Sequence, residues 1–187
     1  EQWEQDHSHI KNYFDMLREQ GITDFERYFD ENPTEVEKCF RMIKIIAANP
    51  AVLSAHGVKD LAEIKKNFQN LTTPESFETF KEQMVRFAQG DYVYEGETQS
   101  QSLTGEKLYS LFKAVIFSQY RETWDRVYVV SIDITPTRQA EAILKRRAEE
   151  MATLHAVSLD ITTPTEIQLV LNSIVERATE YFLGSGG

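Results

Sequence analysis

Several residue types that build functional sites are scarce in this sequence of 187 residues. There is one cysteine, Cys39, so neither an internal disulfide nor a cysteine-cluster metal site can form, and a reducing, cytoplasmic location is expected. Acidic residues outnumber basic ones by 30 to 20, and the net charge of −10 disfavours nucleic acid as a partner. No apolar run approaches the ~20 residues that a membrane-spanning helix needs, and residues 1–15 are too polar for a signal peptide.

Sequence patterns of catalytic and metal sites are missing as well. We find no glycine-rich phosphate loop, no Ser/His/Asp set and no Glu/His metal arrangement. His7 and His9 are two positions apart and would point to different faces of a helix, so they make a poor metal pair. The sequence therefore predicts no catalytic residue, no metal site and no enzymatic activity for this chain.

The composition is that of a chain with a substantial core, because 41% of its residues are hydrophobic and 11% are aromatic. In residues 1–40, apolar side chains from Trp3 and Ile10 onward recur at helical spacing. This spacing predicts helices over 7–20 and 24–29 and a further helix from residue 34. Cys39 lies on the apolar face of that third helix and is interpreted as a small core residue.

From residue 42 onward the pattern alternates between strands and short helices. Thr73-Pro74-Glu75-Ser76 has the form of a capping box that opens a helix. The expected elements are a strand at 42–48, helices at 51–56, 60–68 and 74–89, a hairpin of strands at 92–103 and 107–117, and a strand at 124–134. Consecutive antiparallel strands that follow a cluster of helices indicate an α+β fold.

Both faces of the predicted strands carry apolar side chains, so the sheet needs cover on both sides. The helices within 51–89 can cover one face, and helix 7–20 or a second subunit can cover the other. After the sheet, Thr135 and Pro136 open a helix with an apolar stripe near heptad spacing. We therefore expect a homodimer that forms through helices 7–20 and 136–158. A second amphipathic helix follows within 161–183.

Three short motifs resemble those of PAS sensory domains. Asp133-Ile134-Thr135 is similar to the junction that closes many PAS domains, and Asn49-Pro50-Ala51 followed by Gly57 resembles their helical region. Thr104-Gly105-Glu106 stands where the family turns between its two long strands. The resemblance covers residues 40–145, and it is greatest to PAS modules at the front of bacterial sensor histidine kinases. Residues 154–178 resemble the linker and first helix of a GAF domain.

The resemblance divides the chain into four parts. They are an N-terminal helical region at 1–40, a PAS core at 41–134, a signalling helix and linker at 135–160, and the start of a GAF-like domain with a glycine-rich tail at 161–187. A PAS sheet usually has five strands, two of which precede the Asn-Pro-Ala segment. Only one such strand can be found here, so the first is expected to be missing or shortened.

The resemblance implies a ligand pocket between the sheet and the short helices. The candidate lining residues are Ile45, Leu53, His56, Leu61, Phe77, Phe80, Met84, Phe112, Ala114, Val130 and Ile132. These side chains can equally pack together without a ligand. Helix 74–89 has no histidine to bind heme, and Cys39 lacks the motif of a flavin-binding PAS domain, so heme and flavin are both disfavoured.

The function implied by the resemblance is sensory. A ligand, or a change at a dimer interface, would alter the sheet and move the helix that begins at Thr135, with Asp133 and Thr135 as the signal relay. The regulated output would be a two-component histidine kinase. The alternative is a ligand-free dimerisation module of a diguanylate cyclase or another multidomain signalling protein.

Overall fold

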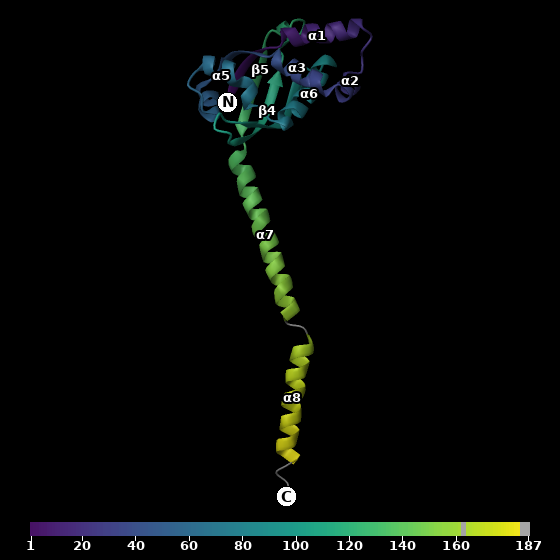
Figure 1. Cartoon of the computed structure of the whole chain (residues 1–187), viewed down its shortest axis with the longest axis vertical. Coiled ribbons are helices and arrows are strands. Elements are labelled where there is room, and N and C mark those ends of the chain that lie inside the picture. Colours follow the sequence, from purple (N-terminus) through teal and green to yellow (C-terminus); the bar gives the residue numbers. More distant parts are fainter. Residues whose placement is uncertain (162–163, 184–187) are drawn as a thin grey trace. The chain divides into compact units, whose positions relative to one another are not determined.

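A five-stranded antiparallel sheet forms the centre of residues 1–138 (Figure 1). The computed structural model describes residues 1–161 and 164–183, with side chains at 1–155, 168–177 and 179. The strand order is β2-β1-β5-β4-β3. The strands are β1 (Gln2–Asp6), β2 (Lys44–Ala48), β3 (Val93–Gln101), β4 (Lys107–Val115) and β5 (Val127–Asp133). The predicted α+β class with an antiparallel sheet is confirmed.

The first strand is present, and the prediction that it is missing or shortened is wrong. β1 lies inside the sheet, where it pairs with both β2 and β5. Its sequence is Gln-Trp-Glu-Gln-Asp, in which Trp3 is the one apolar residue. Such a segment has low strand propensity, so its sequence gives little indication of a strand. Two neighbouring strands satisfy its backbone hydrogen bonds, and this pairing overrides the local preference.

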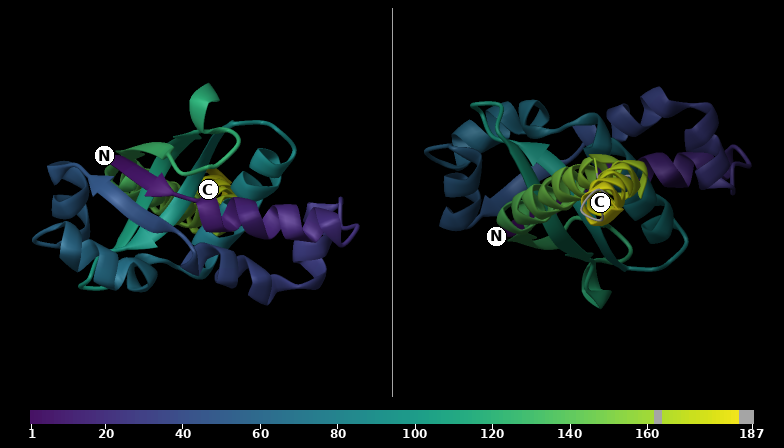
Figure 2. Two further views of the ribbon diagram at one scale, coloured as in Figure 1. Left: turned by 90° about the horizontal axis from the view of Figure 1, so that it is seen from above. Right: turned by 90° about the horizontal axis from the view of Figure 1, so that it is seen from below.

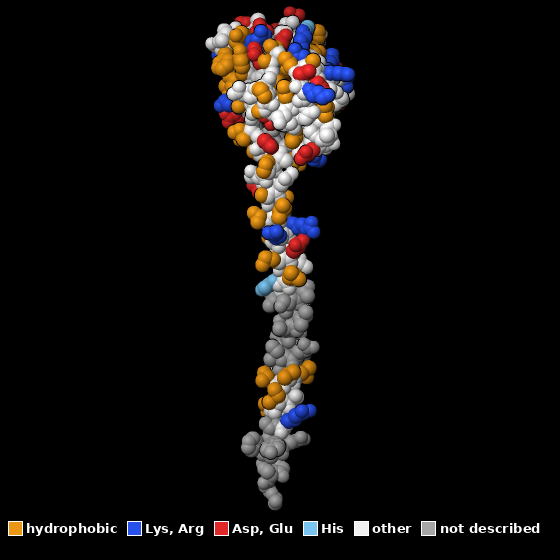
Figure 3. All heavy atoms as spheres, turned by 90° about the vertical axis from the view of Figure 1, so that its left-hand side faces the viewer, with side chains coloured by type: hydrophobic (Ala, Val, Ile, Leu, Met, Phe, Trp, Pro, Cys, Tyr) orange, Lys and Arg blue, Asp and Glu red, His pale blue; other side chains and the backbone are white. Residues whose placement is uncertain are grey.

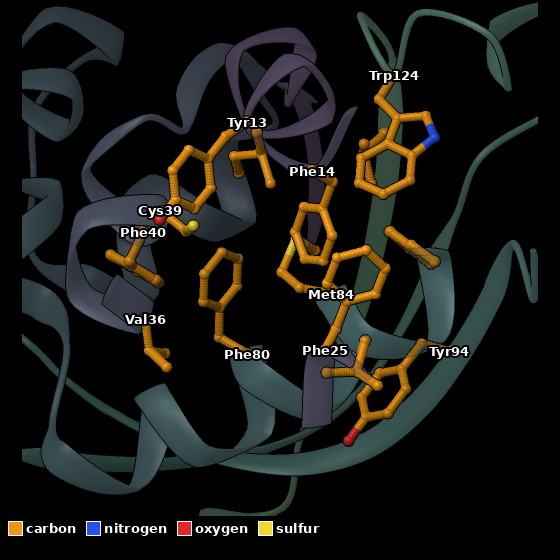
Figure 4. Packing of buried hydrophobic residues seen from close by; sticks show 14 of the residues in the cluster. Tyr13, Phe14, Phe25, Val36, Cys39, Phe40, Phe80, Met84, Tyr94 and Trp124 are labelled. Carbon is orange, nitrogen blue, oxygen red and sulfur yellow. The ribbon is translucent and has the colours of Figure 1, made fainter. Parts of the chain in front are cut away.

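The helical region within 1–40 is therefore an insertion between the interior strand β1 and the edge strand β2. It comprises α1 (Ser8–Glu19), α2 (Phe25–Glu31) and α3 (Pro33–Arg41), which lie together at one end of the sheet (Figure 2). Their apolar faces share one core cluster with residues of β4, β5 and the long helix α6 (Pro74–Ala88). Figure 4 shows Phe14, Phe80 and Met84 within this cluster.

Cys39 and Trp124 are both buried in the same cluster. Burial raises the pKa of the Cys39 thiol to about 12, so it remains protonated and unreactive.

Trp124 contacts Phe14 and Phe87 edge-on or tilted, with ring centroids 5.9 Å and 5.8 Å away. These aromatic contacts join the inserted helices to the sheet.

Side-chain caps and a glycine set the ends of the helices between β2 and β3. Asn49 Oδ1 accepts a hydrogen bond from the Val52 amide at the start of α4 (Pro50–His56), and Gly57 ends the helix at φ 67°. Asp60 caps α5 (Leu61–Asn67), which the short helix η1 (Phe68–Leu71) follows. At the start of α6 the Thr73 amide donates to Ser76 Oγ, as the capping box predicts.

The helices cover one face of the sheet and leave the other open among the described residues. Ala114 and Val129 lie on the covered inner face, and the apolar side of α1 joins the same cluster. The prediction that helix 7–20 covers the opposite face is therefore wrong, and its apolar side is not available for a dimer contact. On the outer face Leu111, Val130 and Ile132 are exposed.

The second unit begins at Gln139, within the long helix α7 (Thr135–Ile161), and includes α8 (Pro164–Leu183). The apolar side chains Ile143, Leu144, Met151 and Leu154 of α7 are all more than half exposed, and hydrophobic side chains are visible on the described helix surface (Figure 3). Thr162, Thr163 and the tail at 184–187 lie outside the described residues, as do the side chains of Ile167 and Ala178. In the described part of the chain, no helix is both long and apolar enough to cross a membrane.

Candidate functional site: a cavity between the sheet and the helices

A cavity of about 140 Å³ lies between the inner face of the sheet and the helices that cover it. Strands β1, β3, β4 and β5 contribute residues to the cavity lining, together with α3, α4, α6 and η1. We call it the central cavity. Its lining residues are Glu1, Trp3, Gln5, Phe40, Ile43, His56, Phe68, Leu71, Thr72, Ser76, Thr79, Phe80, Gln83, Thr98, Ser100, Ser110, Phe112, Val129 and Ser131.

The structure brings three of the predicted pocket residues, His56, Phe80 and Phe112, to this cavity. The other inward-facing candidates lie elsewhere. Leu53 and Leu61 pack in a second apolar cluster, and Ile45 lines a separate surface cleft. Phe77, Met84 and Ala114 pack in or against the main core without lining the central cavity.

Val130 and Ile132 are placed on the wrong face by the prediction. Their exposed fractions are 49% and 63%, whereas Val129 and Ser131 line the cavity. Successive residues of β5 point to opposite faces of the sheet, so an error of one residue in assigning the inward positions exchanges the two faces. The outward set is the more apolar of the two, so hydrophobicity selected the wrong alternation.

The polar lining is the part of the cavity that the apolar candidates missed. Small hydroxyl side chains from three adjacent strands, Ser100, Ser110 and Ser131, line the inner face. For Ser110, the indication in the sequence is its alternation with Phe112 and Ala114, which places this serine on the same strand face as apolar residues. Serine is common on exposed strand faces too, so the sequence by itself does not distinguish the two locations.

Gln83 contributes the most telling polar group. Its side chain is 5% exposed and lines the cavity, yet Nε2 has no hydrogen-bond partner. A buried donor without an acceptor costs about 1–3 kcal/mol. Buried polar groups are nearly always paired, so this amide is a group that a molecule in the cavity would contact.

A buried polar pair includes another residue of the cavity lining, Gln5. His7 is fully buried, and its Nε2 lies 2.8 Å from Oε1 of the cavity residue Gln5. Because the amide oxygen accepts, Nε2 donates, and His7 Nδ1 is left without a partner. Burial lowers the pKa of His7 to about 3, against a smaller opposing influence of Asp6. His7 is therefore neutral at physiological pH.

His56 forms the edge of the cavity next to Trp3, with the two rings in edge-on contact at 5.4 Å. Its Nδ1 lies 3.1 Å from the Val52 carbonyl oxygen and donates to it. This bond fixes the imidazole on its own helix and leaves Nε2 as the remaining polar atom of the ring.

The predicted relay residues hold the start of α7 against the sheet. The Thr135 amide donates to Asp133 Oδ1 at 2.8 Å, so Asp133 caps the helix. The Tyr109 amide of β4 donates to Thr135 Oγ1 at 2.9 Å, and the Ile134 amide donates to the Tyr109 carbonyl. Arg138 forms an ion pair with Glu97 of β3. The first turn of α7 is thereby attached to two strands that line the cavity.

Comparisons with known proteins give structural matches alone. No family model and no curated protein matches the sequence. The PAS domain of the fruit-fly ELK potassium channel is 19% identical and aligns with a TM-score of 0.38 over 49% of this chain and 76% of its own. A domain of what is described as a light and redox sensing histidine kinase from Haloarcula marismortui is 22% identical, with a TM-score of 0.40 over 49% of this chain and 80% of its own.

No group of three or more His, Cys, Asp or Glu side chains that could hold a metal ion occurs among the residues that the structure describes. The central cavity offers apolar ring surface, hydroxyl groups and one unpaired amide donor.

Proposed function

We propose that residues 1–138 are a sensory PAS module that binds a small molecule in the central cavity and regulates an output domain through α7. The unpaired Nε2 of Gln83 carries this proposal, because a ligand with a hydrogen-bond acceptor would satisfy it. The proposal includes a two-component histidine kinase as the output, a GAF-like domain that begins within 161–183, and a cytoplasmic location, which fits the single buried thiol.

The transmission step follows from the arrangement of β4. Ser110 faces the cavity, and the preceding residue, Tyr109, holds Thr135 through its backbone. A ligand that displaces β4 would therefore change the bonds that anchor the first turn of α7. Packed elements respond to such a change by small shifts between discrete positions, which the helix carries to the output domain.

Native mass spectrometry of the purified chain, followed by denaturing spectra, tests the ligand part of the proposal. A bound small molecule would appear as extra mass in the native spectrum and would be released for identification on denaturation. Protein without extra mass, even after expression and purification without dialysis, would contradict a tightly held ligand.

Gln83→Leu is expected to stabilise the empty chain by about 1 kcal/mol, because it removes a buried donor that has no acceptor. The same substitution should abolish retention of the ligand. Chemical denaturation and native mass spectrometry measure the two effects. Gln89→Leu, at the exposed end of α6, is the matched control and should change neither. A strong loss of stability in Gln83→Leu would show that the amide is paired in the empty protein.

Thr135→Val is expected to uncouple the output domain of the full-length protein from the sensory module, at a cost of about 1 kcal/mol in stability. Valine has the same shape but cannot accept the hydrogen bond from Tyr109. Thr135→Ser keeps the hydroxyl and should retain regulation. Asp133→Ala, which removes the cap of α7, should act in the same direction as Thr135→Val. Normal regulation of output activity in folded Thr135→Val protein would contradict the relay.

The second candidate function is a ligand-free dimerisation module of a diguanylate cyclase or another multidomain signalling protein. It is favoured by the exposed apolar side chains of α7, such as Leu144 and Leu154, and by those of the outer sheet face. The predicted homodimer through the N-terminal and C-terminal helices is compatible with both candidates, and of these helices α7 exposes apolar side chains. Dimer mass without ligand mass in the native spectrum would favour this second function.

A further inference from the structure

A second recess, separate from the ligand site proposed above, lies on the surface beside the central cavity. Its volume is about 490 Å³, within the range of sites that bind small organic molecules. The end of α3, the strand β2 and the end of α5 with η1 enclose it. We call it the basic cleft. Its lining residues are Phe40, Arg41, Ile43, Lys44, Ile45, Lys65, Lys66, Phe68 and Gln69.

The charge of the basic cleft is opposite to that of the chain. Four of its nine lining residues are cationic and none is acidic, although the whole chain has a net charge of −10. Like charges brought together in this way repel one another unless an anion binds between them. The last turn of α5 favours Lys65 and Lys66 through the helix dipole, but Arg41 and Lys44 come from other elements.

The protein neutralises these cations only in part. Arg41 is 3.5 Å from Glu37, and Lys44 Nζ is 2.7 Å from His9 Nε2, with Asp6 close enough for its pKa to be lowered in part by Lys44. Among the described residues, Lys65 and Lys66 take part in no ion pair or side-chain hydrogen bond. They are the cations most available to an incoming anion.

The floor of the basic cleft is apolar and aromatic. Phe40 and Phe68 are stacked with their ring centroids 5.0 Å apart and their planes within 4° of parallel, and Ile45 lies beside them. Phe40 and Ile45 are buried, so the partly exposed Ile43 and Phe68 provide the apolar surface that a flat ring can contact, while the lysines and the arginine at the rim match phosphate oxygens. We infer that the basic cleft binds an organic phosphate of nucleotide size, with its ring on the aromatic floor and its phosphates among Arg41, Lys65 and Lys66.

The same aromatic pair links this cleft to the central cavity. Phe40, Ile43 and Phe68 line both, so these side chains form the wall between them. Trp3, on the cavity side, contacts Phe68 edge-on at 6.1 Å. A ligand that shifts Phe68 would therefore be detected at Trp3, whereas Trp124 belongs to the main core on the other side of Phe14.

The test compares ADP, adenosine and inorganic pyrophosphate by calorimetry and by amide and indole NMR spectra. ADP is expected to bind more tightly than either fragment and to shift the indole N–H signal of Trp3 but not that of Trp124. The chain has two tryptophans, so Trp3→Phe assigns both signals. The double variant K65Q/K66Q should weaken ADP binding at least about tenfold, because it removes two cations proposed to contact the phosphates.

The matched control is K59Q/K107Q, which removes two exposed lysines outside the cleft and changes the net charge equally. Retained ADP affinity in this control, with loss in K65Q/K66Q, supports the site. Equal losses in the two variants, or no ADP binding below millimolar concentration, would overturn it. If pyrophosphate bound as tightly as ADP, the proposed role of the aromatic floor would be ruled out. If adenosine bound as tightly as ADP, the proposed role of the cations would be ruled out. Each of these results leaves the central cavity and its Gln83 test unaffected.

Discussion

Phe14→Ala is expected to lower the free energy of unfolding by about 3–5 kcal/mol, the usual cost of truncating a fully buried phenylalanine. Phe14 is 0% exposed and contacts Phe25, Phe29 and Trp124, with ring centroids 4.7 Å, 5.6 Å and 5.9 Å away. Its removal opens a cavity between the inserted helices and the sheet. Total stability of small domains is about 5–15 kcal/mol, so this single change removes a large share of it.

The measurement is urea or guanidinium unfolding of the same chain, followed by tryptophan fluorescence and circular dichroism. Met16→Ala is the control on the same helix, because Met16 is 41% exposed and should cost well under about 1 kcal/mol beyond any change in helix propensity. If α1–α3 were an independent appendage, Phe14→Ala would unfold these helices alone and leave the transition of the sheet unchanged. One cooperative transition that moves to lower denaturant is the result expected from a shared core.

The buried imidazole of His7 is expected to make the chain sensitive to acid well above the pH at which carboxylates titrate. The pKa of His7 is about 3 in the folded protein and has its ordinary value of 6.5 when the chain is unfolded. The unfolded state therefore binds a proton below pH 6.5 that the folded state does not bind. Stability is highest above pH 6.5 and falls as the pH is lowered, by up to about 1.4 kcal/mol per pH unit.

Free energies of unfolding measured in steps between pH 7 and pH 4.5 check this expectation. His7→Gln should remove most of the slope, whatever its own effect on stability, because glutamine does not titrate. His9→Gln should keep the slope, since His9 lies on the surface next to Lys44. The pKa values of Asp6 and Glu35 are also lowered in the folded protein. These carboxylates therefore also reduce stability as the pH falls, but at lower pH than His7 does. Parallel profiles for His7→Gln and the unmodified chain would show that a different group causes the acid sensitivity.

Local chemistry made much of the chain predictable. Thr73 and Ser76 satisfy free amides at the start of α6 through atoms a few residues away, and the helix begins where this capping box predicts. The hairpin at 93–115 follows from its period-two alternation. The junction at Asp133 and Thr135 was indicated by the resemblance to PAS domains, and the structure shows the local hydrogen bond from the Thr135 amide to Asp133.

The sequence by itself determined the α+β class and most helix positions, because these depend on short-range hydrogen bonds and on periodicity. The tertiary structure decided what depends on partners distant in the chain. It made β1 a central strand through pairing with β2 and β5, and it turned Val130 and Ile132 outward by one residue of register. It also left the amide of Gln83 unpaired in the central cavity and brought Arg41 of α3 to the same cleft as Lys65 of α5. Whether a polar group is satisfied, and which charges meet, depends on the packing of the whole chain.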